Sequence, residues 1–287
     1  MPLMGALKAF DRKFGADFIG TVPCAPGVYR MISAAGEVVY VGKAKNLRRR
    51  LGQYRNARRC KADGKMRKIV ASAARLEFEI CESELAACLL EVSLIQELRP
   101  KWNVAGAFSF LYPMIGLARD AGTSWFCFTT APETVSGYSL QGAYRSREIA
   151  GDAFFAWMRL LQYVGHPAGK REREKRREGT KRCYLFGFRS LPEDWFSQWE
   201  LFFKGESPDA LQHLVFALLE NAAARSRARQ IQEDLNALRR FWKHEATLLL
   251  KARQFADYRD YPVPQKDRDP LLLRYRAKDA LAKECLA

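Results

Sequence analysis

The seven cysteines of this 287-residue sequence are odd in number and form no CxxC pair. That pattern fits neither a zinc ribbon nor a disulfide framework, and it suits a reducing cytoplasm. No apolar run approaches the ~18 residues that a membrane span needs. The start, MPLMGALKAFDRKFG, lacks the apolar stretch and cleavage site of a secretory signal. We therefore expect a cytoplasmic protein.

Acidic residues are also scarce relative to basic ones. Lys and Arg outnumber Asp and Glu by 48 to 32, which gives a net charge of +16 and a pI near 9.7. This excess says little about the fold but favours a polyanionic partner, above all nucleic acid. The alternative is a generally basic, soluble protein. An apolar fraction of 48% is ordinary for a globular core, and the length allows two domains or one domain with a helical appendage.

Glycine and proline are both absent between Pro208 and Pro262, which predicts a long helix or a helical hairpin. Apolar residues recur there near heptad spacing, and Glu245 interrupts their seam. The residues of this seam are Ile231, Leu235, Leu238, Trp242 and Leu249. Packing within a hairpin is the simpler interpretation, and a partner helix in trans is the alternative.

Two short β-forming runs open the most informative part of the chain. Residues 27–33 and 37–42 are rich in β-branched and aromatic side chains, and the three residues between them predict a β-hairpin. Residues 43–75 then change to a helical pattern that holds thirteen Lys or Arg against one acid, Asp63.

A strand and a helix complete this unit. Residues 76–81 alternate as a half-buried strand does. Ser83 is placed to cap a helix that runs to about Leu98 and is stopped by Pro100. The order of strands and helices predicts a small three-stranded α/β unit of about eighty residues.

Several residues of this unit have side chains that suit phosphodiester cleavage. Glu91 lies among apolar neighbours, where a carboxylate is costly unless it is paired or binds a metal, although it could also occupy the solvent face of its helix. Tyr29 and Tyr40 lie on the two paired strands, where tyrosine is often only a good β former. Arg50 and Tyr54 share a helical face, and an arginine there is commonly a phosphate or solvent contact.

Taken together, five ordered strings carry a resemblance: GVY (27–29), YVG (40–42), KAKNLRRRLGQY (43–54), LLE (89–91) and PKWN (100–103). Their order and spacing resemble the GIY-YIG endonucleases. The nearest branch is the N-terminal nuclease domain of the bacterial excinuclease UvrC and its stand-alone Cho-like relatives. The resemblance implies a three-stranded antiparallel sheet flanked by helices and covers about eighty residues.

The resemblance also implies a role for each matching residue. Glu91 matches the single carboxylate that binds Mg²⁺ or Mn²⁺. Tyr29 and Tyr40 match the two motif tyrosines, one of which serves as general base, and Arg50 matches the arginine that stabilises charge at the scissile phosphate. Lys43 and Tyr54 match supporting catalytic residues of the family. The residues that match its DNA-binding positions are Gly42, Lys45, Asn46, Arg48, Arg49 and Asn103.

These roles agree with elementary chemistry. A tyrosine with a pKa of ~10 is a poor base near neutrality. We therefore expect Lys43, Arg50 and a nearby cation to lower that pKa. One divalent ion on one carboxylate, with water and phosphate as its other ligands, is typical of Mg²⁺ and would act as a Lewis acid. The family resemblance implies 3′-hydroxyl and 5′-phosphate products.

The remaining sequence is less informative. We expect strands near 112–117 and 125–130, an amphipathic run at 152–164 and a solvated basic loop at 170–182. The predicted organisation is a lead-in (1–22), a GIY-YIG nuclease domain (23–105), a mixed α/β middle region (106–207), a helical hairpin (208–258) and a tail (259–287).

The predicted function is a structure- or damage-directed DNA endonuclease that makes one metal-dependent incision in nucleotide excision repair. Residues 142–165 and the helical stretch 209–256 resemble the middle of UvrC more faintly, which implies double-stranded DNA and a repair helicase or damage-recognition protein as partners. Between residues 142 and 256 the sequence offers only Cys183 where relatives carry a cysteine cluster, so no iron–sulfur cluster is expected. Alternatives are a GIY-YIG nuclease for restriction or mobile-element processing, and a non-catalytic basic DNA-binding protein.

Overall fold

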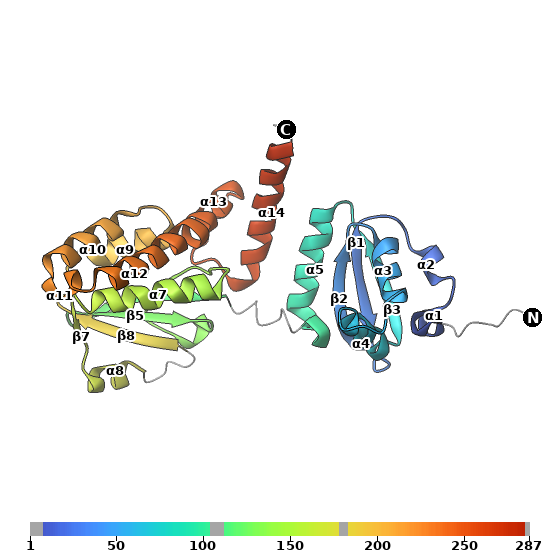
Figure 1. Ribbon diagram of the computed structural model, residues 1–287, viewed down its shortest axis with the longest axis horizontal. Coiled ribbons are helices and arrows are strands. Elements are labelled where there is room, and N and C mark those ends of the chain that lie inside the picture. The colour runs from blue at the N-terminus through green and yellow to red at the C-terminus, as the bar shows by residue number, and fades with distance from the viewer. Residues whose placement is uncertain (1–7, 104–111, 178–182, 285–287) are drawn as a thin grey trace, which may run out of the picture. The chain divides into compact units, whose positions relative to one another are not determined.

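The computed structural model describes residues 8–103, 112–177 and 183–284. The chain divides into two compact units, Met1–Phe110 and Leu111–Ala287 (Figure 1). Within the described ranges, every helix is too short or too polar to cross a lipid bilayer.

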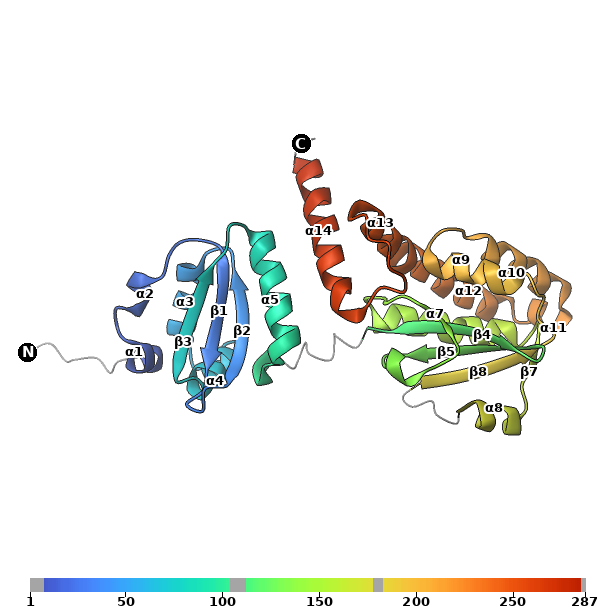
Figure 2. The ribbon, with the colours of Figure 1, turned by 180° about the vertical axis from the view of Figure 1, so that it is seen from behind.

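The N-terminal unit is built on an antiparallel three-stranded sheet in the order β2-β1-β3. Helix α5 lies on one side of this sheet and α3 on the other (Figures 1 and 2). The predicted hairpin and the predicted α/β fold of this region are confirmed. In chain order the elements are α1 (Ala9–Phe14), α2 (Phe18–Thr21), β1 (Gly27–Ile32), β2 (Val38–Ala44), α3 (Leu47–Arg55), α4 (Gly64–Ser72), β3 (Arg75–Ile80), α5 (Glu84–Leu98) and the 3₁₀ turn η1 (Lys101–Asn103).

A β-bulge decides which side chains of the hairpin face α3. The register shifts so that Val39 is an extra residue in β2, after which Tyr40 pairs with Met31 and Gly42 pairs with Tyr29. Opposite residues of an antiparallel pair point to the same face, and successive residues alternate faces. The two tyrosines therefore share the face that α3 covers. In a register without this shift, Val39 would pair with Met31 and Tyr40 with Arg30, which would turn Tyr40 to the opposite face.

Local signals explain where the helices of this unit begin and end. Asn46 caps α3 by accepting a hydrogen bond from the backbone N–H of Arg49 at 2.9 Å. Ser83 caps α5 through the N–H of Ala86 at 3.0 Å, as the sequence predicts. Helix α5 ends at Arg99 in the left-handed conformation, immediately before Pro100.

The C-terminal unit contains a five-stranded antiparallel sheet in the order β6-β4-β5-β8-β7. Helices α7, α9, α10 and α12 gather over one face of the sheet, and α8 lies on the other side (Figures 1 and 2). Its elements are β4 (Met114–Asp120), β5 (Thr123–Thr129), η3 (Pro132–Thr134), β6 (Ser139–Gln141), α7 (Arg147–Leu161), β7 (His166–Pro167), α8 (Lys170–Arg177), β8 (Cys183–Arg189), α9 (Trp195–Lys204), α10 (Asp209–Glu220), α11 (Ala222–Arg225), α12 (Ala228–Phe241), the π-helical turn η4 (Trp242–Ala246), α13 (Thr247–Phe255) and α14 (Gln265–Glu284).

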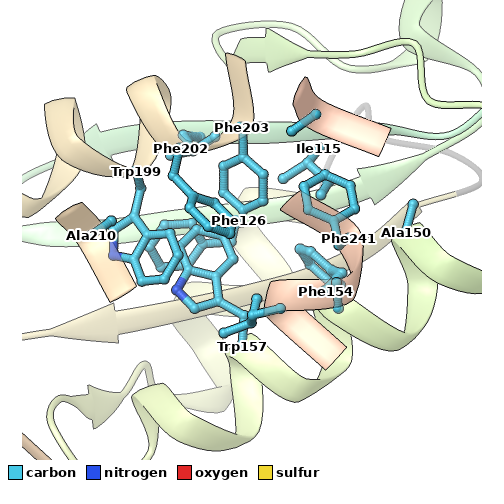
Figure 3. Close-up of a cluster of buried hydrophobic side chains, with 14 of the residues drawn as sticks. Ile115, Phe126, Ala150, Phe154, Trp157, Trp199, Phe202, Phe203, Ala210 and Phe241 are labelled. Carbon is cyan, nitrogen blue, oxygen red and sulfur yellow. The ribbon is translucent and has the colours of Figure 1, made fainter. Parts of the chain in front are cut away.

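Aromatic side chains form the core of this unit (Figure 3). Trp157 of α7 is fully buried and its ring centroid lies 4.5 Å from those of both Phe126 and Trp199. Phe203 and Phe241 extend the cluster toward α9 and α12. Aromatic residues bury a large apolar area each, so this cluster holds the helices on the sheet.

The stretch between Pro208 and Pro262 is helical, and α12 continues through η4 into α13. Most of the predicted apolar seam lies in the core, with Leu238 fully buried. Glu245, which interrupts the seam, is buried where its carboxylate accepts the backbone N–H groups of Arg145 and Ser146 at 2.6 and 3.1 Å. Glu245 therefore anchors the two residues that precede α7, whose N-cap is the Ser146 side chain. The division of this half at residues 207 and 258 stays a prediction.

Two segments differ from the sequence-based expectation. The predicted basic loop forms helix α8 over Lys170–Arg177, and residues 178–182 lie outside the described part. The acidic residues of this segment favour a helix over a loop. Glu172 accepts the backbone N–H of Gly169 at 2.6 Å, and Glu174 pairs with Lys170 one turn earlier.

The second is the predicted tail at 259–287, which contains α14. Pro264 stands just before this helix, and Pro270 removes only one hydrogen bond within it. Burial of Arg268, Leu271 and Leu272 fixes the helix to the unit.

Candidate functional site

Three tyrosines of the N-terminal unit come together on the α3 face of the sheet. Tyr29 lies on β1, Tyr40 on β2 and Tyr54 on α3, and their ring centroids are 5.7 to 6.4 Å apart. The Tyr29 hydroxyl donates to the Tyr54 hydroxyl at 3.1 Å. Residues far apart in the sequence thus form one phenol cluster.

Gly42 makes room for this cluster. A Cβ atom at that position would lie 2.5 Å from the Tyr29 hydroxyl and 2.9 Å from a ring carbon of Tyr40. Gly42 and Tyr29 are register partners, so the missing side chain leaves the space that the Tyr29 ring fills. The glycine of the YVG string is therefore required by the tyrosines.

Arg50 joins the cluster from α3. Its Nε donates to the Tyr29 hydroxyl at 3.3 Å, and its Nη1 donates to Gln53 Oε1 at 2.7 Å. The guanidinium carbon lies 5.5 Å from the centre of the Tyr54 ring, within cation–π range. The four-residue spacing of Arg50 and Tyr54 places them one turn apart, as predicted.

Burial governs the acidity of two of the phenols. The pKa of Tyr29 lies well above its ordinary value, because burial and then Tyr40 outweigh the lowering effects of Tyr54 and Arg50. Burial, followed by Tyr29 and Tyr40, likewise raises the pKa of Tyr54. Arg50 lowers the pKa of Tyr29 as expected, but burial and Tyr40 outweigh it, so the net direction is upward and Tyr29 is a neutral phenol at neutral pH.

Glu91 lies on α5, where its Oε1 accepts the backbone N–H of Lys43 at 3.0 Å and its Oε2 lies 3.8 Å from Lys43 Nζ. Its side chain is 20% exposed, which distinguishes it from a residue on the solvent face of the helix. Burial raises the pKa of Glu91, opposed by the Lys43 N–H, the Lys43 ammonium and Arg50. A bound cation would stabilise the charged form of this half-buried carboxylate, so Glu91 is suited to bind one.

A divalent cation fits the donor chemistry at Glu91. Carboxylate oxygens are hard ligands, and among the residues that the structure describes the contact to Oε2 is the long one from Lys43. Among the described residues, no group of three or more His, Cys, Asp or Glu side chains could hold a metal. A cation at Glu91 would therefore take water and phosphate as its remaining ligands, which Mg²⁺ accepts.

Lys43 connects this carboxylate with a cysteine that the sequence interpretation missed. Its ammonium donates to Cys88 Sγ at 2.9 Å. Burial lowers the pKa of Lys43, but Cys88, Glu91 and Glu84 together raise it above its ordinary value. The signal was the spacing of 84, 88 and 91, which places three side chains on one face of α5.

A cleft of about 480 Å³ lies between the start of α3 and this face of α5. It is lined by five predicted site residues, all on or after β2, and by five others that were not predicted. The predicted ones are Lys43, Lys45, Asn46, Arg49 and Arg50, and the others are Ala44, Gln53, Glu84, Ala87 and Cys88. Its cationic lining suits a phosphate group.

Several residues predicted to contact DNA hold the fold in place. Asn103 forms two hydrogen bonds of 2.8 Å with the backbone N–H and carbonyl of Val41. Arg48 donates to the carbonyls of Val22 and Gly20 at 2.7 and 3.3 Å, which fixes the segment before β1. Lys45 pairs with Glu84 at 2.7 Å within the cleft.

Two further contacts were not predicted. Asp11 of the lead-in is buried and forms a two-point ion pair with Arg55, at 2.6 and 3.0 Å, so α1 braces the helix that carries Arg50. Lys65 of α4 places its ammonium 5.9 Å from the Tyr40 ring centre. No local sequence signal links these partners, which are 44 and 25 positions apart.

Comparisons with known proteins match the part of the chain that contains this site. The model of the UvrC-like GIY-YIG domain matches residues 25–104. UvrABC system protein C of Chlorobaculum tepidum is 41% identical over 105 residues, covering 37% of this chain and 17% of that protein. The protein of the same name from Aromatoleum aromaticum is 43% identical over 115 residues, covering 40% and 19%.

Among solved structures, the chain is similar to the GIY-YIG N-terminal endonuclease domain of UvrC from Thermotoga maritima bound to magnesium. The identity is 38%, with 30% of this chain and 90% of that chain covered and a TM-score of 0.27. The matched stretch spans less than a fifth of the length of the curated relatives named above.

Proposed function

We propose that the chain is a DNA endonuclease of nucleotide excision repair, because residues 25–104 match the model of the UvrC-like GIY-YIG domain. One observation carries the proposal. Arg50 is hydrogen-bonded to the buried Tyr29 at the edge of a cleft lined by cationic side chains, with the half-buried carboxylate of Glu91 on the neighbouring helix. This arrangement combines charge stabilisation with a cation ligand.

The proposed roles follow from the surroundings of each residue. Arg50 and Lys43 stabilise negative charge on the scissile phosphate, because both line the cleft. Tyr29 is held neutral by burial and orients Arg50 by accepting the hydrogen bond from its Nε. Tyr40 is the least buried of the three phenols, and as the phenolate, with its own proton released to solvent, it would take the proton from the attacking water.

Glu91 would hold one Mg²⁺ or Mn²⁺ ion, which when bound neutralises the phosphate and stabilises the leaving oxygen. Gly42 and Asn103 position the tyrosine strands, while Lys45, Asn46, Arg48 and Arg49 form or support the DNA-facing side of the cleft. Products with 3′-hydroxyl and 5′-phosphate ends are expected.

We further propose that the chain makes a single incision in double-stranded DNA. It would act in the cytoplasm. One tyrosine–arginine–carboxylate site supports one cut per encounter, and a repair helicase or damage-recognition protein would direct it to the lesion. The basic stretch 43–75 would contact the DNA backbone, so affinity should fall steeply as salt rises.

A plasmid assay tests the proposal. Supercoiled DNA, damaged or undamaged, is incubated with the wild type, Glu91→Ala and Tyr40→Phe, with Mg²⁺, Mn²⁺ or chelator. We expect nicking by the wild type that needs the cation, and loss of nicking in both variants while DNA binding persists.

The outcomes separate the parts of the proposal. Nicking that survives both Glu91→Ala and chelation would overturn the metal-dependent nuclease. Full activity of Tyr40→Phe would remove that residue as proton acceptor. Equal cutting of undamaged DNA would overturn the repair role and favour restriction or mobile-element processing, whereas binding without cutting under every condition would indicate a non-catalytic DNA-binding protein.

A further inference from the structure

An apolar groove runs between α10 and α12 of the C-terminal unit. Two adjoining cavities of about 600 and 340 Å³ lie along it, and both are lined by Val215 and Leu235. At its edge Phe216 and Leu219 are 64% and 57% exposed. Large apolar side chains exposed together along a groove are typical of a surface that binds another protein.

The walls of the groove have the geometry of a seat for a helix. Leu211, Val215 and Leu219 follow one another every four residues along α10, and Ile231 and Leu235 do so along α12. Such rows form ridges, and the space between two ridges accepts the side chains of a third helix. An amphipathic helix lying in an apolar groove is a recurring mode of recognition.

The charged residues that line the groove indicate which charges the polar face of a bound helix should carry. Arg239 lines the cavity beside Pro208 at the start of α10, and Arg225 lines the cavity beside Leu219 near its end. No Asp or Glu is found among the described residues that line the two cavities. Leu211 and Leu219 are ~12 Å apart along the helix, at ~1.5 Å per residue. The two positive charges therefore lie toward opposite ends of a short groove.

We propose that this groove binds an amphipathic helix of a second protein, with an apolar face for the groove and acidic residues about two turns apart for Arg225 and Arg239. Burial of the apolar face contributes the affinity, and the flanking charges contribute orientation and selectivity. This interaction surface is separate from the cleft at Lys43 and Arg50, because its lining residues all belong to the C-terminal unit.

Peptide binding to the full chain tests the proposal. The probe is a fluorescein-labelled amphipathic helical peptide with Leu on one face and two Glu residues about eight positions apart. The comparison peptide has Lys in place of both Glu residues. Fluorescence anisotropy is expected to show binding of the acidic peptide at least about tenfold tighter than that of the basic peptide.

Matched variants locate the binding. Phe216→Ser combined with Leu219→Ser should weaken binding by about tenfold or more, since both side chains are exposed and their loss leaves the core intact. The control is Leu201→Ser, a partly exposed apolar residue on α9 outside the groove. Arg239→Glu should weaken only the acidic peptide, whereas Arg229→Glu, on the same helix but in neither cavity, should not.

Three outcomes would overturn the proposal. The first is no binding of the acidic peptide at about 1 mM, and the second is equal binding of both peptides or of the wild type and the Phe216 and Leu219 variant. The third is a wild-type dimer, measured by light scattering, that dissociates in this variant, because a second copy of the chain would then occupy the groove.

Discussion

Each of the two units contains a glutamate that accepts backbone N–H hydrogen bonding and faces a basic side chain, but Glu245 is buried and Glu91 only half-buried, and their oxygens are occupied differently. Glu245 uses both carboxylate oxygens on the N–H groups of Arg145 and Ser146, and its side chain is 5% exposed. Glu91 uses one oxygen on the N–H of Lys43 and is 20% exposed. Burial raises the pKa of both groups.

The basic side chains that face the two glutamates also differ in their exposure to solvent. Arg268 is fully buried, 3.6 Å from Glu245, and burial lowers its pKa to about 10, so it remains charged at neutral pH. Lys43 is 45% exposed and lines an open cleft. A carboxylate with both oxygens occupied and an enclosed partner stabilises a fold, whereas one with an incompletely used oxygen beside a cleft is suited to bind a ligand.

The largest expected effect separates the two glutamates by activity. Glu91→Gln should lower the rate of plasmid nicking by about a thousandfold, because the amide is a poor cation ligand. Thermal unfolding of the N-terminal unit should change little. Glu97→Gln on the same helix is the control, since Glu97 is exposed and should leave the rate unchanged. Unfolding of Glu91→Gln at much lower temperature would mean that Glu91, like Glu245, is structural.

The reciprocal change acts on stability. Glu245→Gln should lower the free energy of unfolding of the C-terminal unit by about 3 kcal/mol, because it leaves the Arg268 charge buried and unpaired. Tryptophan fluorescence during urea unfolding reports this unit, which contains five of the six tryptophans.

Nicking by Glu245→Gln at low temperature should match the wild type. The control is Glu233→Gln, whose exposed pair with Arg229 should contribute little. A stable Glu245→Gln protein with impaired nicking would contradict the structural role.

A smaller effect is expected at Gly42. In Gly42→Ala the new methyl group would meet the Tyr29 hydroxyl and the Tyr40 ring, so the phenol cluster must shift. We expect nicking to fall by about tenfold to a hundredfold, because small misplacements of reacting groups are costly.

Gly52→Ala is the matched control, because nothing lies within 4 Å of the added Cβ in helix α3. That variant should be more stable by roughly 0.5–1 kcal/mol. Equal activity of both variants and the wild type would show that the cluster tolerates displacement.

The smallest expected effect concerns pH. Protonated Glu91 cannot hold a cation, and its raised pKa means that protonation begins at a higher pH than for an ordinary glutamate. Nicking should therefore fall as the pH is lowered, and a higher Mg²⁺ concentration should move this fall to lower pH by competition. Rates measured across pH at several Mg²⁺ concentrations check this. A fall that does not depend on Mg²⁺ would assign the titration to another group.

Sequence reasoning succeeded where the signals were local. The hairpin, the Ser83 cap and the shared face of Arg50 and Tyr54 depend on residues close in the chain, and the structure contains all of them. Gly42 was recognised as a motif residue, but the contact that requires a glycine was visible only in three dimensions.

The missed features depend on partners distant in the chain. Cys88 acquires a contact because β2 lies beside α5, and Asp11 does so because α1 lies against α3. In the sequence, Glu245 is only an interruption of an apolar seam. Its role was not visible there because its hydrogen-bond donors are about a hundred positions earlier. The direction of the Tyr29 pKa was also beyond the sequence, since it depends on burial that a strand pattern does not quantify.

The extra residue Val39 has a consequence for how such a hairpin can vary in length. Counted from the turn, Tyr40 lies one residue further along its arm than its partner Met31 does. Deletion of Val39 would remove the bulge but leave Val38 opposite Ile32 and Tyr40 opposite Met31, so Tyr40 would stay on the α3 face. The hairpin can therefore lose the bulge without losing the phenol cluster, whereas a register in which Val39 paired with Met31 would turn Tyr40 toward α5.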